Sequence, residues 1–256
     1  MLNFSDILSF YPNRLHAFKE NILKEYLQHK ILDIIFSTKY AQRVVFLGGT
    51  SLRIVHNSTR FSEDLDFDNL GLTQSDFKEI SKAIKHQLEL DGYTIEIRNV
   101  FKNAFHCYIR FPGLLFSANL SGHKEEKVLI QLDAEPQGYK YIPNKYLLNK
   151  FGLFRYINVP PIDLLLAQKI CAIFTRKREK GRDFFDVVYL MSKTEPDFKF
   201  LKLKLDIDSK RELIDRLKEK TEALNLKILA KDIEPFLFDP SQKDRVLYFK
   251  EWLNTL

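Results

Sequence analysis

Two short segments near the start of the chain carry residue types that could bind a nucleotide and a metal ion. An apolar run at residues 44–47 ends in Gly48-Gly49-Thr50-Ser51, and residues 60–68 read Arg-Phe-Ser-Glu-Asp-Leu-Asp-Phe-Asp. Paired glycines let the backbone approach a ligand closely, and the N–H groups at the start of a following helix bind phosphate. This order predicts a phosphate-binding turn followed by metal-binding carboxylates.

Asp64 and Asp66 are the carboxylates that alternation along a strand would place side by side on one face. Two adjacent carboxylates repel each other unless a cation joins them. Mg²⁺, or Mn²⁺ in its place, takes oxygen ligands and bridges to substrate phosphates. Asp68 shares this face but is predicted to be a bystander or a supporting residue. Each segment also has a purely structural interpretation. The glycine pair could be a plain turn, and the Asp-x-Asp could be the solvated face of a strand. The two segments in this order favour a phosphate- and metal-binding site.

A third carboxylate is predicted at the end of an apolar strand at residues 127–135, just before Pro136. A carboxylate on a neighbouring strand would complete the metal coordination and accept the proton of an attacking hydroxyl. Asp133 is the candidate, and Glu135, on the same predicted face, is the fallback. On the residues alone, an acid at the solvated end of a strand is an equally good interpretation.

A second charged region spans residues 169–186. Lys169 lies in a strongly apolar predicted helix, where a lysine needs a partner or a ligand. A basic loop follows, which on its own is typical of a solvated turn between helices. Beyond the loop, Asp183 and Asp186 are three residues apart on one predicted helix face. They could orient Lys169 and Arg182, or they could take part in catalysis.

Both regions resemble the signature motifs of the AbiEii/MenT-like nucleotidyltransferase toxin family. In that family a Gly-Gly/Ser turn precedes an Asp-x-Asp, and a helical Lys precedes an Arg seven residues on and an Arg-Asp-x-x-Asp. The resemblance implies that the metal is held by Asp64, Asp66 and Asp133. Catalytic roles are implied for Asp64, Asp66, Asp133, Lys169 and Asp186. Nucleotide contacts are implied for Gly48, Gly49, Thr50, Ser51, Arg60, Ser62, Lys169, Arg176, Arg182 and Asp183.

The resemblance also implies an α+β fold of the DNA polymerase-β-like kind. We expect an N-terminal nucleotidyltransferase domain at residues 1–158, with a mixed sheet flanked by helices, and a helical domain at 159–256 that completes the active-site cleft. The patterning agrees, because residues 12–38 and 74–90 have helical periodicity and residues 93–111 alternate like a hairpin. Residues beyond Pro160-Pro161 look largely helical.

The activity implied by the resemblance is the transfer of NMP from an NTP to an acceptor hydroxyl, with Mg²⁺ or Mn²⁺ as cofactor. The expected acceptor is RNA, with the 3′ end of tRNA as one candidate. The setting would be a toxin–antitoxin or phage-defence system with a cognate antitoxin.

Two other functions deserve comparison with this one. A non-catalytic regulator of the same fold could bind nucleotide or nucleic acid, but the intact acids and Lys169 count against a degenerate site. A glycosyltransferase also uses an Asp-x-Asp metal site, but the upstream glycine turn and the region at 169–186 fit that class poorly.

Composition restricts the class of protein further. A chain of 256 residues with 45% hydrophobic and 13% aromatic residues excludes a disordered protein. A net charge of +6 and a pI of about 9.1 favour a polyanionic partner, although such basicity also occurs in proteins that bind no nucleic acid. Two distant cysteines support neither a disulfide framework nor a zinc site. With no leader-like or membrane-spanning run, we expect a cytoplasmic protein without a membrane partner.

Aromatic residues and lysines alternate at residues 139–156, including Lys140, Lys145 and Lys150. Such a mixture can stack bases and hold phosphates, and it can equally cover the edge of a core.

Overall fold

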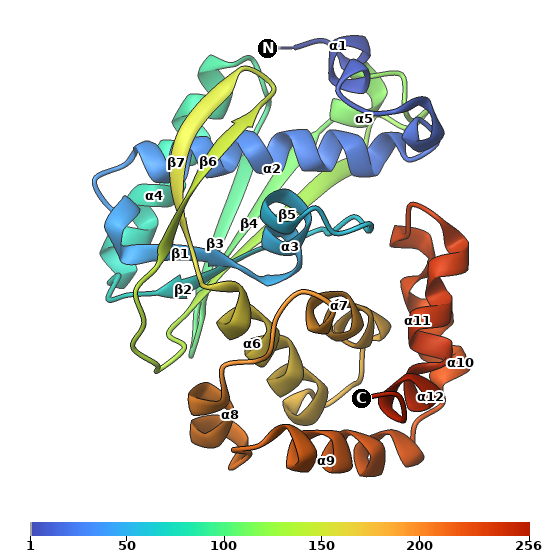
Figure 1. Ribbon diagram of the computed structural model, residues 1–256. Helices are drawn as coiled ribbons and strands as arrows, with labels where there is room; N and C mark the ends of the chain where they lie inside the picture. The colour runs from blue at the N-terminus through green and yellow to red at the C-terminus, as the bar shows by residue number, and fades with distance from the viewer. Residues whose placement is uncertain (1) are drawn as a thin grey trace. The chain divides into compact units, whose positions relative to one another are not determined.

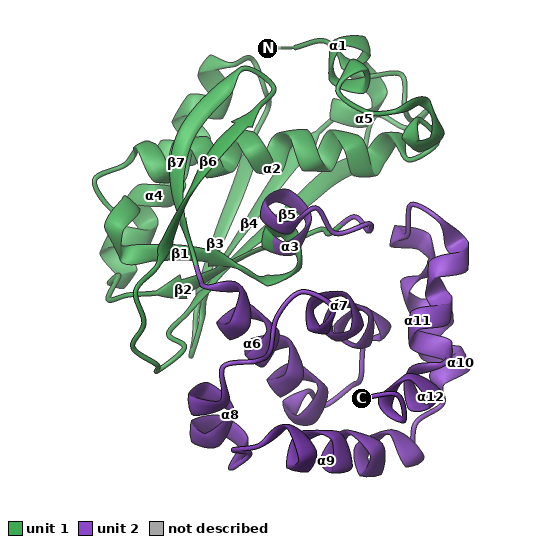
Figure 2. Ribbon diagram, in the orientation of Figure 1, with its two compact units in different colours: residues 1–51, 62–159 green, residues 52–61, 160–256 purple. Residues whose placement is uncertain are grey.

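The computed structural model describes residues 2–256, which divide into two compact units (Figures 1 and 2). Unit 1 contains the residues up to 51 and residues 62–159, and unit 2 contains residues 52–61 and 160–256. The expected domain boundary at 158/159 lies one residue before the last switch between units, at 159/160. Residues 52–61, which the sequence analysis placed in the N-terminal domain, group with the C-terminal helices instead.

Unit 1 is built on a five-stranded mixed sheet of order β1-β2-β5-β4-β3, which confirms the expected α+β class. The strands are β1 (Val44–Leu47), β2 (Leu65–Asn69), β3 (Glu96–Phe101), β4 (Phe105–Pro112) and β5 (Lys127–Glu135). Strands β2 and β5 run parallel, and the other neighbouring pairs are antiparallel. The predicted hairpin is therefore present as β3 and β4.

Alternation gives the central strands one apolar and one polar face. In β5, the buried residues Val128, Ile130 and Leu132 lie in register with buried residues of β4. The residues between them, among them Gln131 and Asp133, face the other way. The sheet thus separates its packed side from the side that carries the acids.

Helices α2 (Lys19–Ser37) and α4 (Gln74–Leu90) pack against each other and against the sheet (Figure 1). The predicted helix at 74–90 is present as α4, and the residue before it, Thr73, is its N-cap, with a side chain that accepts a hydrogen bond from the Asp76 N–H. Helix α2 buries apolar residues nearly all round, because it also contacts a two-stranded ribbon of β6 (Asn144–Lys150) and β7 (Leu153–Val159). The short helices of the unit are α1 (Phe4–Ser9) and α5 (Leu114–Ser117).

Unit 2 is helical, and its helices are α6 (Ile162–Thr175), α7 (Gly181–Met191), α8 (Phe198–Leu205), α9 (Lys210–Glu222), α10 (Leu226–Ile233), α11 (Asp244–Leu247) and α12 (Phe249–Leu253). Helices α11 and α12 are separate because Tyr248 between them leaves helical geometry at φ −101° and ψ 28°. Helix α3 (Gly48–His56) begins in unit 1 and ends in unit 2. No helix in residues 2–256 is long and apolar enough to cross a membrane.

Candidate active site

Asp66 and Asp133 lie side by side on the polar face of the sheet. They are register partners on the parallel strands β2 and β5, and neighbouring strands in a sheet are about 4.8 Å apart. Glu135, the fallback for the third carboxylate, pairs instead with Asp68. The register therefore favours Asp133 over Glu135 as the partner of Asp66. Asp64 lies directly before β2, outside the strand.

Gly48 brings the start of helix α3 against the Asp66 carboxylate. It follows β1 directly, and the last residue of β1, Leu47, is the register partner of Asp66. Gly48 has a φ of 79°, which favours glycine, and a Cβ there would lie 2.8 Å from the Cβ of Asp66. A glycine is required at this position because any side chain would displace the carboxylate.

The hydroxyl residues of the turn are buried rather than open. Thr50 Oγ1 donates a hydrogen bond of 2.5 Å to the backbone oxygen of Asp64 and so fixes the approach to β2. The Oγ atom of Ser51 is buried without a hydrogen-bond partner in the described chain. The backbone oxygen of Ser62 accepts a hydrogen bond of 2.9 Å from the side chain of Gln28 on α2. These contacts hold the two segments of the first motif in place.

Two side chains that the sequence analysis did not single out hold Asp133. His106 Nδ1 lies 2.7 Å from Oδ1 of Asp133, and Gln131 Nε2 lies 3.0 and 2.9 Å from its two oxygens. His106 is the register partner of Asp133 on β4. Alternation marks Gln131 as sharing the face of Asp133, but the register that brings His106 there cannot be derived from the sequence.

Of the two roles that the sequence analysis left open for Asp68, bystander or supporting residue, its contacts indicate the supporting one. Its oxygens accept hydrogen bonds from the Gln137 N–H at 2.9 Å and from the Tyr141 hydroxyl at 2.8 Å. Burial, together with the charge of Asp68, raises the pKa of Tyr141, so the phenol stays protonated and donates. Asp68 therefore anchors the segment between β5 and β6.

The acids fit a cation that takes part of its coordination from substrate and water. Within residues 2–256, no three side chains of His, Cys, Asp or Glu gather closely enough to enclose a metal ion by themselves. Asp66 and Asp133 nevertheless present oxygen donors in register, and the Gly48 backbone meets the Asp66 carboxylate. Mg²⁺ is typically held by one or two carboxylates plus substrate phosphates and waters, so this donor set is compatible with it.

Unit 2 contains a cluster of charged side chains, most of them from the region at residues 169–186. Lys169 Nζ on α6 lies 2.8 Å from Oδ2 of Asp186 and 3.6 Å from Oδ1 of Asp183, both on α7. Arg176 Nε lies 2.7 Å from Oδ2 of Asp183. The fifth member is Arg60, whose Nε and Nη2 donate to the two oxygens of Asp186 at 2.8 and 2.6 Å. We call these five residues the charge cluster.

Arg60 is a buried structural partner in this arrangement. Its side chain is 1% exposed, and its Nη1 donates to the Phe61 backbone oxygen at 2.9 Å. Two backbone hydrogen bonds hold the segment around Arg60 in unit 2. The Phe61 N–H donates to the Phe236 oxygen at 2.8 Å, and the Phe238 N–H donates to the Thr59 oxygen at 3.0 Å. The geometry thus gives Arg60 a contact with Asp186, where the sequence analysis expected one with nucleotide.

Asp186 stays ionised in the cluster. Burial alone would raise its pKa, but the charges of Arg60 and Lys169, and the hydrogen bonds they donate, outweigh burial and hold the pKa below its usual value. Asp186 is completely buried, so its oxygens act through the two cations rather than on a ligand. Of the two roles considered for Asp186, the geometry favours orienting Lys169.

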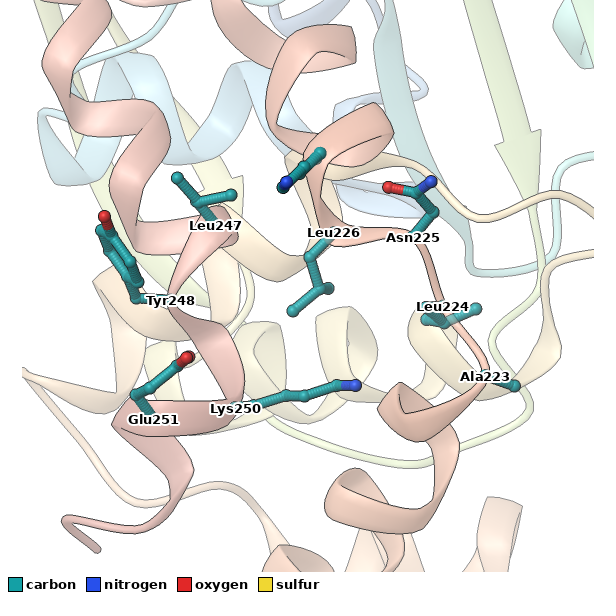
Figure 3. Close-up of a pocket in the computed structure, with 9 residues that line it drawn as sticks. Ala223, Leu224, Asn225, Leu226, Leu247, Tyr248, Lys250 and Glu251 are labelled. Atoms are coloured by element: carbon teal, nitrogen blue, oxygen red, sulfur yellow. The ribbon is translucent and has the colours of Figure 1, made fainter.

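The other basic residues of the charged region at 169–186 are more exposed than Lys169. Arg176 has 43% of its side chain exposed, and Arg182 is half-buried and forms no ion pair with Asp183 or Asp186. Gly181 starts α7, where a Cβ would lie 2.8 Å from the backbone carbon of Leu229, so only glycine fits. A pocket of about 710 Å³ between residues 223–227 and 247–251 of unit 2 contains none of the predicted site residues (Figure 3).

Comparison with known proteins decides the family. The model of a family described as "Nucleotidyl transferase AbiEii toxin, Type IV TA system" matches residues 30–254. The chain belongs to the AbiEii family of nucleotidyltransferase toxins. It is therefore a nucleotidyltransferase, and membership implies an NTP substrate, a divalent metal ion and an antitoxin as partner. No curated protein matches the chain.

Solved structures share the AbiEii-family fold. The crystal structure of JHP933 from Helicobacter pylori is 18% identical with a TM-score of 0.56, and the match covers 92% of this chain and 90% of that chain. Another H. pylori structure, of a protein provisionally assigned as a nucleotidyltransferase, is 19% identical with a TM-score of 0.54. Its match covers 91% of this chain and 93% of that chain.

Proposed function

We propose that this AbiEii-family protein transfers NMP from an NTP to a hydroxyl group of RNA, with Mg²⁺ as the metal ion. The observation that carries the proposal is the in-register pair of Asp66 and Asp133 beside the glycine at the start of α3. It combines two oxygen donors for a cation with backbone N–H groups that suit phosphate. The 3′ end of tRNA is a candidate acceptor.

In this mechanism the residues of unit 1 hold the reacting phosphate. Asp64, Asp66 and Asp133 would ligate Mg²⁺, and the turn from Gly48 to Ser51 would bind phosphate oxygens through its backbone. When bound, Mg²⁺ neutralises charge on the phosphates. The acceptor oxygen forms a bond to the α-phosphorus, the bond from that phosphorus to the α–β bridging oxygen breaks, and pyrophosphate leaves. Asp133 is the candidate to accept the hydroxyl proton.

The charge cluster of unit 2 carries the second group of residues proposed to bind nucleotide. It contains three cations and two carboxylates, an excess of one positive charge. In this proposal Lys169 and Arg176 contact phosphate oxygens, with Arg182 as a further contact, and Asp183 and Asp186 set the positions of the cations. Charges placed in advance need no reorganisation when the transition state forms.

The proposal is tested by incubating the protein with each of four α-labelled NTPs, Mg²⁺ and total RNA from a bacterial cell. We expect one NTP to label a discrete RNA species on a denaturing gel, because a pocket for one base discriminates against the others. Chelation of the metal should abolish labelling. Absence of transfer from every NTP would contradict the enzymatic proposal and favour the non-catalytic regulator.

A further inference from the structure

The β6–β7 ribbon of unit 1 has one face turned inward and one turned outward. In the antiparallel register, Leu148 pairs with Arg155, and Leu147 with Tyr156. Because register partners share a face, the inner face carries Leu148 and Arg155 and the outer face carries Tyr156. Phe154 is two residues before Tyr156 and therefore also lies on the outer face.

The inner face fixes the ribbon to helix α2. Leu148 is 1% exposed, Arg155 Nε lies 2.7 Å from Asp33 Oδ1, and Lys150 Nζ lies 2.9 Å from Glu25 Oε1. These contacts leave the ribbon little freedom to turn over. The outer face is thus held open by the fold.

The outer face exposes two large rings. Phe154 is 69% exposed and Tyr156 is 63% exposed. Neither ring packs against another aromatic ring or a cation among residues 2–256. Elsewhere in unit 1 most aromatic rings are buried or pack against one another, as Phe77 packs edge to face against Phe105. With most of their surface exposed, the rings of Phe154 and Tyr156 contribute little to the packing of unit 1.

The charge around the rings is positive. Residues 136–162 contain Lys140, Lys145, Lys150 and Arg155 and no aspartate or glutamate. The carboxylates of α2 pair with Lys150 and Arg155, whereas the exposed residues Lys140 and Lys145 form no ion pair with a carboxylate of the described chain. Lys145 Nζ donates a hydrogen bond of 2.5 Å to Asn158 Oδ1, which leaves its positive charge unneutralised. Lys145 lies on the outer face itself, as the register partner of Asn158. This surface suits a polyanion.

The spacing of the rings suits stacked bases. Residues two apart on a strand are separated by about 6.6 Å, roughly twice the ~3.4 Å between stacked bases. The other outer-face side chains are the exposed Lys145 and Asn149, the half-buried Leu147 and the buried Asn158, so the rings are surrounded mainly by polar groups rather than by an aliphatic patch. A stable protein interface would need about 800 Å² on each partner with an apolar centre. Base stacking needs only the rings and nearby cations.

We propose that the outer face of the β6–β7 ribbon is a stacking platform for a single-stranded segment of the RNA acceptor, with Phe154 and Tyr156 stacking on bases and Lys145 and Lys140 beside the phosphates. This inference rests on the proposed function for the identity of the RNA as acceptor. It adds a binding surface apart from the carboxylates and the charge cluster.

The test measures binding of a fluorescent single-stranded 12-nucleotide RNA to the full chain by anisotropy, without NTP. Stacking of a base on an aromatic ring contributes substantially to the free energy of binding. The variant Phe154→Ala/Tyr156→Ala should therefore bind the RNA at least about tenfold more weakly than wild type. The matched control is Phe116→Ala/Tyr248→Ala, which removes one exposed phenylalanine and one exposed tyrosine elsewhere and should leave binding unchanged.

Two further variants separate stacking from other kinds of contact. Phe154→Trp/Tyr156→Trp keeps planar rings and should bind RNA as wild type does. Phe154→Leu/Tyr156→Leu keeps apolar surface without rings and should lose binding. Equal binding by the alanine variant and wild type would overturn the inference. So would full binding of the RNA by the leucine variant, because apolar surface without aromatic rings would then be sufficient.

The proposed function and this inference fail in different ways. If wild type transfers NMP to RNA but the alanine variant has an unchanged KM for RNA, only the platform is wrong. A failure of wild type to transfer NMP to any RNA would remove the proposed function, and the anisotropy measurement would still decide whether the ribbon binds RNA. The Kd for NTP, measured without RNA, should stay within about twofold in the alanine variant, as is usual for separate sites.

Discussion

Replacing Asp66 with asparagine should lower the rate of nucleotidyl transfer by about 10³-fold, which corresponds to roughly 4 kcal/mol of lost transition-state stabilisation. The amide keeps the shape of the carboxylate beside Gly48 but cannot neutralise a divalent cation together with Asp133. The measurement is the initial rate of NMP incorporation into RNA at saturating NTP and Mg²⁺.

The fold should survive this change, because Asp66 and Asp133 repel each other when no cation is bound. We expect the metal-free free energy of unfolding of Asp66→Asn to equal that of wild type or exceed it by up to about 1 kcal/mol. Asp133→Asn should lose activity as well, whereas Glu135→Gln, on an exposed residue of the same strand, should stay within about threefold of wild type. An active Asp66→Asn variant, or equal losses in the two β5 variants, would contradict these roles.

Replacing Asp186 with alanine should reduce the free energy of unfolding by about 3–5 kcal/mol, the usual cost of removing one partner of a buried ion pair. Arg60 and Lys169 would keep buried charges without their shared counter-ion. Urea unfolding measures the loss. As a control, Glu79→Ala breaks an exposed pair with Lys82 and should leave the free energy of unfolding nearly unchanged.

The stabilisation from Asp186 should also depend on pH in a definite direction. Its pKa is lowered in the folded protein, so its contribution is complete above the ordinary aspartate pKa of about 3.9 and is lost as the pH falls through the folded value. The stability difference between wild type and Asp186→Asn should therefore be constant from about pH 5 to 8 and shrink below about pH 4. A difference that grows on acidification, or an Asp186→Ala variant as stable as wild type, would contradict the ionised cluster.

Much of the fold follows from local patterns in the sequence. The capped helix α4 and the hairpin of β3 and β4 were predicted because their signals lie within a few neighbouring residues. The β6–β7 ribbon was not predicted, since Asn144–Lys150 lacks a regular alternation of polar and apolar residues. The place of residues 52–61 in unit 2 depends on hydrogen bonds to residues 236–238, far along the chain.

The same difference applies to the candidate site, where contacts within one short stretch could be predicted and contacts between distant residues could not. Gly48, Asp64 and Asp66 belong to one short stretch, and the structure places Gly48 against Asp66. Arg60 belongs to the same stretch, but its carboxylate partner Asp186 lies 126 residues away, so the sequence could not show that its guanidinium is already paired. The roles of these residues in nucleotide and metal binding stay predictions.

The measurement that tests nucleotidyl transfer most directly follows two phosphates of the same NTP. Wild-type protein is incubated with Mg²⁺, RNA and the preferred NTP, labelled at the α-phosphate in one reaction and at the γ-phosphate in the other. The account predicts that the α label enters RNA while the γ label appears in pyrophosphate, because the bond between the α-phosphorus and the α–β bridging oxygen is the one that breaks. Transfer of the γ label to RNA, without the α label, would contradict it.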